Sequence, residues 1–218
     1  MGKSILTRRG ALLAGAAALV SACVPTGGRS RDAGGYRAPD PAPRPVPNAG
    51  WDAWVDGFKG RASGRGISQS TIDSAFRGAG FLPEVIEKDR NQTEFKRSLE
   101  DYLNIAASDE RVTLGRQKFA QYGGTLSAIE SRYGVEGHVV AAVWGLESFF
   151  GTRRGAVPVV SALSTLAYEG RRGEFFESQL VAALRILQAG DISAGAMTGS
   201  WAGAMGHTQF IPTSYLEY

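Results

Sequence analysis

The sequence contains few of the residues that build disulfides and metal sites. Its 218 residues include one cysteine, Cys23, and two histidines, His138 and His207. One thiol excludes an intramolecular disulfide, and so few thiols and imidazoles do not suffice for a cysteine-rich or histidine-rich zinc site. Neither a P-loop nor a dinucleotide-binding glycine fingerprint occurs, and no Gly-x-Ser-x-Gly elbow would present a nucleophilic serine. We expect no metal and no cofactor.

Excess positive charge is also lacking outside the first 22 residues. The net charge is +3, and Lys3, Arg8 and Arg9 are the only charged residues before Cys23. Removing residues 1–22 lowers the 24 basic residues by three to 21, equal to the 21 acidic residues. Because nucleic-acid binding depends on a basic field, we expect no nucleic-acid partner.

Residues 1–22 have the composition of an export signal. The three cations precede the apolar run 10–20, which is too short to cross a bilayer. Residues 19–23, LVSAC, resemble a bacterial lipobox, which predicts that Cys23 is acylated and becomes the mature N-terminus. The arginine pair resembles part of a twin-arginine signal, so the Sec and Tat routes both stay open. The alternative for a lone cysteine is a buried small hydrophobic residue.

Residues 23–48 are rich in glycine, arginine and proline. Five of the nine prolines alternate there, at Pro39, Pro41, Pro43, Pro45 and Pro47. Alternating prolines favour extended, semi-rigid polyproline conformations. We interpret 23–48 as a flexible tether between a lipid anchor and a globular body. The alternative is a disordered tail without consequence.

From residue 49 to residue 218 the chain has the periodicity of helices. Trp51, Val55 and Phe58 recur at spacings of three and four residues, which places them on one helical face. Ser68 is suited to cap a second helix. The glycines at 123 and 124 are expected to bend the helical stretch 110–134. Further helices are expected within 94–107, 136–150, 159–168 and 174–190. Since no segment alternates with a period of two, the predicted fold class is all-α (mainly helical).

The segment 143–151, VWGLESFFG, places one carboxylate among apolar residues. In a helix, Val143, Trp144 and Phe150 lie three or four residues from Glu147 and therefore on its side of the helix. Burial beside a tryptophan disfavours the ionised form of a carboxyl group and so raises its pKa, as it does for the catalytic glutamate of lysozyme. Such a group can donate and accept a proton at a working site. The alternative is an ordinary glutamate on a solvated face of the helix.

A second segment, 199–215, reads GSWAGAMGHTQFIPTSY. Gly203 and Gly206 permit close approach of backbone segments, and Pro212 suits the first turn of a new helix. By composition alone this is a glycine-rich loop with Met205 and Phe210 in the core.

Three stretches, in this order and spacing, resemble the lytic murein transglycosylase B family: 143–151, 162–176 (ALSTLAYEGRRGEFF) and 199–215. The similarity extends back through 66–76 and 90–95, and covers roughly residues 51–218. The resemblance implies a helical, lysozyme-like catalytic domain of an exported, often lipid-anchored enzyme. Members of the family cleave the β-1,4 bond between N-acetylmuramic acid and N-acetylglucosamine in peptidoglycan.

By this resemblance, Glu147 is the single catalytic acid and base. It would protonate the glycosidic oxygen, while the muramyl 2-acetamido group stabilises C1 in place of a second carboxylate, as in substrate-assisted glycosidases. It would then take the proton of the muramyl C6 hydroxyl, which closes onto C1 and leaves a 1,6-anhydro end.

The resemblance also implies substrate-binding residues. Ser200 and Gln209 match the family's Ser-x-Ala-Gly-Ala-Met-Gly-x-x-Gln motif and would hydrogen-bond the acetamido or neighbouring sugar groups. Arg171, Arg172 and Phe175 match its Arg-Arg-x-Glu-aromatic motif and would line the glycan or peptide-stem side of the cleft. Without the resemblance these residues read as a helix-capping serine, a solvated arginine pair and a core phenylalanine.

The sequence departs from the family pattern at two places. His207 stands where a tyrosine is common, and it receives no role. The chain ends at Tyr218, where the family usually continues, so the catalytic domain is expected to be incomplete at its C-terminus. No Asp-x-Asp-x-Asp-Gly loop occurs, and we expect no calcium.

The sequence therefore predicts a monomeric peptidoglycan lytic transglycosylase on the periplasmic face of the outer membrane. Its partners would be peptidoglycan glycan strands and, through the lipid on Cys23, the membrane. Two alternatives remain open: a hydrolytic muramidase, and a non-catalytic peptidoglycan-binding lipoprotein, which the short C-terminus favours.

Overall fold

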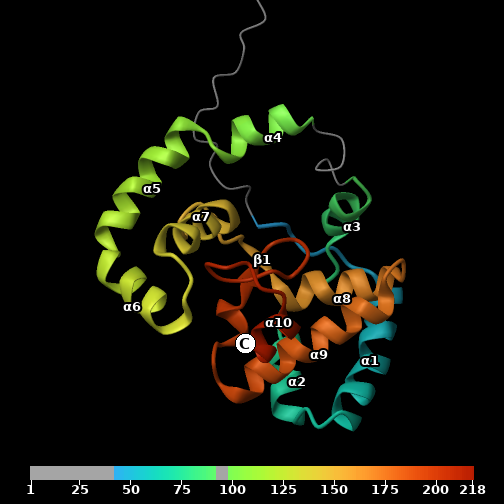
Figure 1. The fold of residues 1–218 in the computed structure, drawn as a ribbon. Helices are drawn as coiled ribbons and strands as arrows, with labels where there is room; N and C mark the ends of the chain where they lie inside the picture. Colours follow the sequence, from blue (N-terminus) through green and yellow to red (C-terminus); the bar gives the residue numbers. More distant parts are fainter. Residues whose placement is uncertain (1–41, 92–97) are drawn as a thin grey trace, which may run out of the picture. The chain divides into compact units, whose positions relative to one another are not determined.

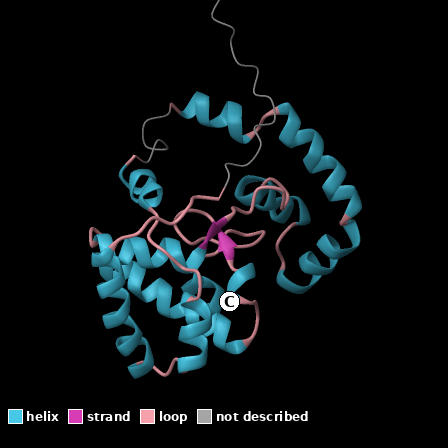
Figure 2. Ribbon diagram, turned by 180° about the vertical axis from the view of Figure 1, so that it is seen from behind, coloured by secondary structure: helices cyan, strands magenta, loops and turns pink. Residues whose placement is uncertain are grey.

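Helices make up most of the structure, a computed structural model that describes residues 42–91 and 98–218. The prediction of a mainly helical fold is confirmed (Figures 1 and 2). The predicted export signal, Cys23 and most of the predicted tether lie outside the described residues. The elements in chain order are α1 (Ala49–Gly64), α2 (Gln69–Phe76), α3 (Pro83–Arg90), α4 (Leu99–Ala106), α5 (Asp109–Gln121), α6 (Gly123–Tyr133), α7 (Gly137–Ser148), β1 (Val157–Pro158), α8 (Val159–Glu169), α9 (Gly173–Ala189), η2 (Ala194–Ala196), β2 (Thr198–Gly199) and α10 (Pro212–Glu217).

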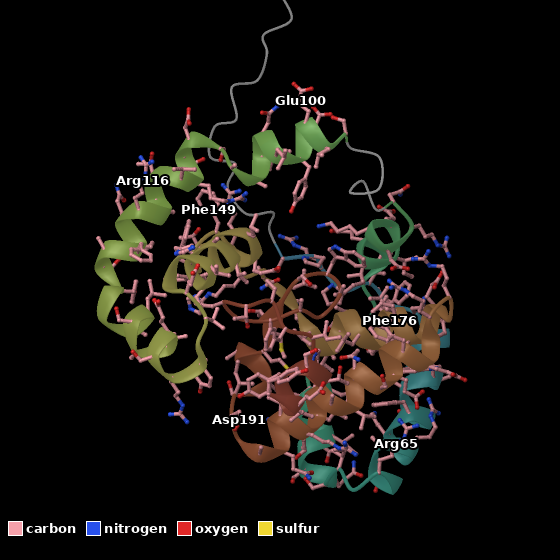
Figure 3. All side chains as sticks on the ribbon, viewed as in Figure 1. Arg65, Glu100, Arg116, Phe149, Phe176 and Asp191 are labelled. Carbon is pink, nitrogen blue, oxygen red and sulfur yellow. The ribbon has the colours of Figure 1, made fainter. Side chains whose placement is uncertain are left out.

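The core is built around α8 and α9, which follow each other in the sequence and pack against each other (Figure 1). Every residue of α8 from Val159 to Ala167 is buried, which explains its unbroken run of apolar and small side chains. On α9, Phe176 (labelled in Figure 3) and Leu180 point into the same core. Helices α1, α2 and α3 cover this pair. Each fully buried large apolar side chain contributes about 1.5–3 kcal/mol of transfer free energy.

The helix ends follow local sequence signals. The predicted cap at Ser68 is confirmed, since its Oγ accepts the backbone N–H of Thr71 at 3.2 Å. The stretch 110–134 is divided into α5 and α6 at Tyr122, next to the two glycines. Helices α8 and α9 end at Gly170 and Gly190, whose φ angles of 90° and 84° are left-handed and therefore favour glycine.

Residues 42–48, the last part of the predicted tether, contact the helical body. The N–H of Val46 donates to the carbonyl oxygen of Phe81 at 2.9 Å. Asn48 caps α1, because its Oδ1 accepts the N–H of Trp51 at 3.0 Å. Pro45 lies close to Gly80, because a Cβ added to Gly80 would be 2.6 Å from the Cβ of Pro45. The contacts of the body therefore begin at least as early as Pro45.

Helices α5 and α6 pack against α7, whereas α4 buries none of its residues. The apolar side chains of α4 are exposed: Leu99 is 72% and Leu103 51% exposed. Residues 94–97 of the helix expected within 94–107 lie outside the described residues. A cavity of about 510 Å³ lies between α4, α5 and α7 and is lined mainly by apolar side chains such as Val112 and Phe119.

Two short strands join the segment after α7 to the segment before α10. β1 and β2 are antiparallel, with Val157 opposite Gly199 and Pro158 opposite Thr198 (Figure 2, magenta). Strands of two residues agree with a sequence that lacks period-two alternation. In the part of the chain that the structure describes, no helix combines the length and the hydropathy needed to cross a bilayer.

Candidate active site

Glu147 is the last residue but one of α7, and it is exposed. Its neighbours Val143 and Leu146 are also 46% and 45% exposed. The prediction that apolar neighbours bury this carboxylate is wrong, and the alternative of a solvated face holds. Helix α7 is apolar on nearly all sides, so periodicity could not identify its covered face. That face carries Ala141 and Gly145, the latter roughly opposite Glu147 at 100° per residue. An exposed acid remains accessible to a substrate.

The chain reverses sharply after Glu147. Phe149, Phe150 and Gly151 have φ angles of 50°, 57° and 85°, three left-handed residues in succession. Each non-glycine residue in this region costs about 1–2 kcal/mol, so packing must stabilise the turn. The ring of Phe150 supplies part of that packing, since it lies against Gly145 of α7 and Gly115 of α5.

The ring of Phe149 (labelled in Figure 3) lies near two guanidinium groups. Arg153 is centred 4.2 Å and Arg111 of α5 5.3 Å from the ring centroid, within the range of cation–π attraction. Burial and the nearby charge of Arg153 lower the pKa of Arg111, because both disfavour its charged form. The turn after Glu147 is therefore held to α5 as well as to α7.

His207 connects the 199–210 loop to the end of α7. The indole Nε1–H of Trp144 donates to Nδ1 of His207 at 2.9 Å. The hydroxyl of Ser148 donates to the carbonyl oxygen of His207 at 2.7 Å. The ring also covers Gly151, where a Cβ would lie 2.3 Å from Cε1 of His207. These contacts flank Glu147 on both sides along the helix.

Ser200 organises the start of the same loop. Its Oγ accepts the backbone N–H groups of Ala202 at 3.3 Å and Ala204 at 3.1 Å. Its own N–H donates to the carbonyl oxygen of Ala204 at 2.8 Å. Two acceptor positions of the hydroxyl are thus used, while its proton is available to a further acceptor.

Gln209 closes the loop from the other end. Its backbone has a left-handed φ of 51°. Its Nε2 donates to the carbonyl oxygens of Arg154 at 3.1 Å and Gly206 at 3.0 Å. Because both amide protons are engaged, Oε1 is the part of this side chain that can bind a ligand, as an acceptor.

Glycines allow the backbone segments of this site to touch. A Cβ on Gly155, whose φ is 88°, would lie 2.1 Å from the carbonyl oxygen of Gly199. A Cβ on Gly199 would lie 2.2 Å from the carbonyl oxygen of Ala204. The chain after α7 and the 199–210 loop are therefore in direct backbone contact, which brings Glu147, Ser200 and Gln209 into one region.

Arg171 and Arg172 form a different cluster, between α8, α9 and α3. Both guanidinium groups bind the carboxylate of Asp89, which is 2% exposed; Nε of Arg171 donates to its Oδ2 at 2.9 Å. Nη2 of Arg171 also donates to the carbonyl oxygen of Asp89 at 2.7 Å. The arginine side chains themselves are 48% and 43% exposed, so each keeps a surface for other contacts.

Two further features complete this cluster. Phe175 is exposed, and its ring packs edge-on against that of the buried Phe176, with 5.1 Å between the ring centroids. Arg90 donates to Glu169 at 2.6 Å, and this bond lowers the pKa of the Glu169 carboxyl. Arg171, Arg172 and Phe175 thus lie together, as a group tied to α3 rather than to α7.

A cavity of about 470 Å³ adjoins the 199–210 loop on the side of His207. Arg154, Asp191, Phe210 and Tyr215 also line it. The hydroxyl of Tyr215 donates to Asp191 at 3.3 Å, and the negative charge of Asp191 raises the pKa of Tyr215. Among the described residues, no group of three or more His, Cys, Asp or Glu side chains could hold a metal ion.

Sequence reasoning missed Asp89 and the contact between Trp144 and His207. Asp89 pairs with residues more than 80 positions away, a distance at which no local pattern applies. One signal was present, because Asp89 follows the buried Val85 by four residues and so lies on the covered face of α3. Trp144 and His207 were noticed in their motifs, but their mutual contact was not foreseen.

The described domain is mainly helical and carries an exposed glutamate near the end of α7. Hydrogen bonds join that helix to a glycine-rich loop with hydroxyl and amide side chains. The chain belongs to the Transglycosylase SLT domain family, whose model matches residues 50–218. The predicted family resemblance and the predicted fold class are both confirmed.

Individual relatives agree with this assignment. Membrane-bound lytic murein transglycosylase B of Escherichia coli (strain K12) is 33% identical over 99 residues, which are 45% of this chain and 27% of that protein. SltB3 of Pseudomonas aeruginosa, crystallised in complex with NAG-NAM-pentapeptide, is 46% identical with a TM-score of 0.75 over 78% of this chain and 46% of SltB3. The soluble lytic transglycosylase SltB1 of the same organism is 28% identical with a TM-score of 0.65, over 75% of this chain and 56% of SltB1. The chain thus spans only about a quarter to just over half of the length of these relatives.

Proposed function

We propose that the protein is a lytic transglycosylase that cleaves the MurNAc–GlcNAc β-1,4 bond of peptidoglycan glycan strands. Family membership supports the reaction class. SltB3, which shares the fold, has been crystallised with both NAG-NAM-pentapeptide and NAG-anhNAM-pentapeptide. The observation that carries the proposal in this chain is the contact of His207, a residue of the loop of Ser200 and Gln209, with Trp144 and Ser148, which lie three residues before and one residue after Glu147.

In the first step Glu147 acts as the acid. Its carboxyl proton passes to the glycosidic oxygen, the C1–O bond of the muramyl residue breaks, and the GlcNAc-bearing fragment leaves as an alcohol. The muramyl 2-acetamido oxygen attacks C1 from the opposite face, so no second protein carboxylate is needed.

In the second step the carboxylate of Glu147 acts as the base. It removes the proton of the muramyl C6 hydroxyl, and the C6 oxygen forms the new bond to C1 while the acetamido oxygen leaves. The product carries a 1,6-anhydro ring, and Glu147 regains its proton. One group that alternates between its two protonation states therefore serves the whole cycle.

Ser200 and Gln209 would orient the acetamido group through the atoms that the loop leaves unused. The hydroxyl proton of Ser200 can be donated to the acetamido carbonyl or to a sugar hydroxyl, because Oγ already accepts two backbone N–H groups. Oε1 of Gln209 can accept the acetamido N–H, because both protons on Nε2 are engaged. Such orientation raises the effective concentration of the internal nucleophile.

Arg171, Arg172 and Phe175 would contact the glycan or its peptide stem. Asp89 neutralises one of the two guanidinium charges, so the cluster as a whole keeps a positive charge that suits a carboxylate of the stem. The exposed ring of Phe175 offers an apolar surface next to it.

Digestion of purified sacculi tests the proposal. Wild-type protein is expected to release muropeptides with 1,6-anhydromuramyl ends, and Glu147→Gln to release none. Glu100→Gln, which changes an exposed glutamate of α4 (Figure 3), is the matched control and should retain activity. Reducing ends in place of anhydro ends would identify a hydrolytic muramidase. Binding to sacculi without either product would identify a non-catalytic peptidoglycan-binding protein.

We further propose that acylation of Cys23 anchors the protein at the periplasmic face of the outer membrane. The lipobox-like sequence before Cys23 supports this, as does the membrane-bound relative in Escherichia coli. Radiolabelled palmitate should be incorporated into the wild type and not into Cys23→Ala. Equal labelling of both, or of neither, would contradict the anchor.

A further inference from the structure

We propose that His207 is a positioning residue, which fixes Glu147 against the loop of Ser200 and Gln209 only while its Nδ1 carries no proton. The inference rests on the proposed function and goes beyond it, since the reaction itself requires no histidine. Its basis is that His207, which belongs to the loop that would hold the sugar, contacts the helix that carries the acid.

The two hydrogen bonds of His207 bracket the catalytic position. Trp144 precedes Glu147 by three residues, which is almost one helical turn, and Ser148 follows it directly. Trp144 contacts the ring of His207 and Ser148 its backbone carbonyl. Both the side chain and the main chain of His207 therefore set the distance between the last turn of α7 and the loop.

The direction of the ring contact fixes its protonation state. An indole N–H can only donate, so Nδ1 of His207 must be the acceptor at 2.9 Å. A protonated imidazole carries N–H groups on both nitrogens and would present a donor to a donor. Protonation of His207 therefore breaks the contact with Trp144, while the neutral ring keeps its proton on Nε2.

His207 is exposed, and charged and titratable groups of several elements line the same cavity. Arg154 after α7, Asp191 after α9 and Tyr215 of α10 line the cavity that His207 also lines, and Glu147 lies on α7 itself. Tyr215 binds Asp191 through its hydroxyl, so part of the negative charge facing the cavity is already compensated.

The inference predicts opposite effects of acid on the two groups. A lower pH keeps Glu147 in the form that can donate its proton, but it also breaks the Trp144–His207 contact. Loss of activity on the acid side would then come from the histidine and not from the glutamate. His207→Asn separates the two effects, because an asparagine Oδ1 can take the place of Nδ1 as an acceptor and does not titrate.

The first measurement follows the indole N–H of Trp144 by ¹⁵N NMR in the full chain. Trp144→Phe removes the resonance and so assigns it among those of the four tryptophans. We expect the resonance to be protected from exchange at neutral pH, to lose protection on acidification in the wild type, and to keep it in His207→Asn. In His207→Ala it should be unprotected at every pH. A resonance that His207→Ala leaves unchanged would overturn the contact.

The second measurement is the pH dependence of sacculus digestion. We expect His207→Ala to lower kcat by about 10- to 100-fold with little change in KM, because a displaced acid impairs the reaction more than binding. His207→Asn should restore kcat near neutral pH and lose less activity in acid than the wild type does. Wild-type kcat in His207→Ala, or the same acid loss in His207→Asn and wild type, would overturn the positioning role. A wild type that releases no product would contradict the proposed function, while the spectra would still confirm or overturn docking by His207.

Discussion

Gly145 lies at the tip of the Phe150 ring: a Cβ added to Gly145 would be 2.6 Å from Cζ of that ring. Gly115 of α5 also lies close to Cζ, with a corresponding distance of 3.0 Å. The reversal of the chain after Glu147 thus depends on two positions without a side chain.

Gly145→Ala is expected to lower the free energy of unfolding by up to about 2 kcal/mol. Overpacking costs about 1–3 kcal/mol, and the gain in helix propensity offsets about 1 kcal/mol of that cost. Urea denaturation measures the difference. Gly60→Ala in α1, where a Cβ meets nothing within 4 Å, is the control and should stabilise by about 0.5–1 kcal/mol. Equal effects of the two substitutions would contradict the packing of Phe150.

Asp89→Asn is expected to destabilise the protein by about 2–3 kcal/mol. The substitution leaves a buried neutral amide that cannot balance the positive charges of Arg171 and Arg172. Because both arginines are partly exposed, water reduces the resulting loss of stability. Asp56→Asn breaks an exposed pair with Lys59 and should change stability by at most about 0.5 kcal/mol. Thermal unfolding of the two variants makes the comparison. Similar shifts of their melting temperatures would show that the burial of Asp89 does not increase the stabilisation by its ion pairs.

Gly155→Ala is expected to reduce both stability and activity more than Gly206→Ala does. Both glycines have left-handed φ angles, 88° and 73°, so both substitutions carry a backbone cost of about 1 kcal/mol. Only the Cβ at Gly155 meets a backbone atom, the carbonyl oxygen of Gly199 at 2.1 Å. Chemical denaturation and sacculus digestion of both variants test this. A larger defect in Gly206→Ala would show that the contact between the two segments is unimportant.

The ion pair between Arg61 and Glu177 gives the α1–α9 contact a predictable dependence on pH. The hydrogen bond from Arg61 lowers the pKa of Glu177 in the folded state. Because the folded pKa is depressed, the stabilisation is complete above the unfolded value, about 4.3, and is lost as the pH falls through the folded value. The free energy of unfolding of the wild type should therefore exceed that of Glu177→Gln by about 0.5–1 kcal/mol at pH 7. Urea titrations should show this gap closing below about pH 4; a constant gap would contradict the linkage.

The helical fold could be predicted from sequence because its signals are local. Trp51, Val55 and Phe58 recur at helical spacing and are buried on one face of α1, and Ser68 caps α2 through a bond that spans three residues. The break near Gly123 follows from the same kind of signal. In each case the residues that determine the element lie within one or two helical turns.

The environment of Glu147 could not be predicted in this way. Apolar residues occur on nearly every side of α7, and the covered face is chosen by Phe150, Gly115 and the helices α5 and α6, which periodicity does not reveal. The left-handed backbone of Phe149 and Phe150 likewise has no signal of its own besides the glycine that follows. The roles assigned to Glu147, Ser200 and Gln209 remain predictions that the digestion experiment addresses.

The burial of α8 from Val159 to Ala167 has a consequence for the order of folding. A helix that is covered on all sides cannot be the last to dock, and its nearest cover, α9, is also its neighbour in sequence, so this hairpin closes at a small entropic cost. We expect the pair to form the folding nucleus. Chevron analysis should then give Leu163→Ala a φ-value of about 0.5–0.8 and Val85→Ala on α3 a value of about 0–0.3. Substitutions in α8 would slow the appearance of the native state, whereas those in α3 would shorten its lifetime.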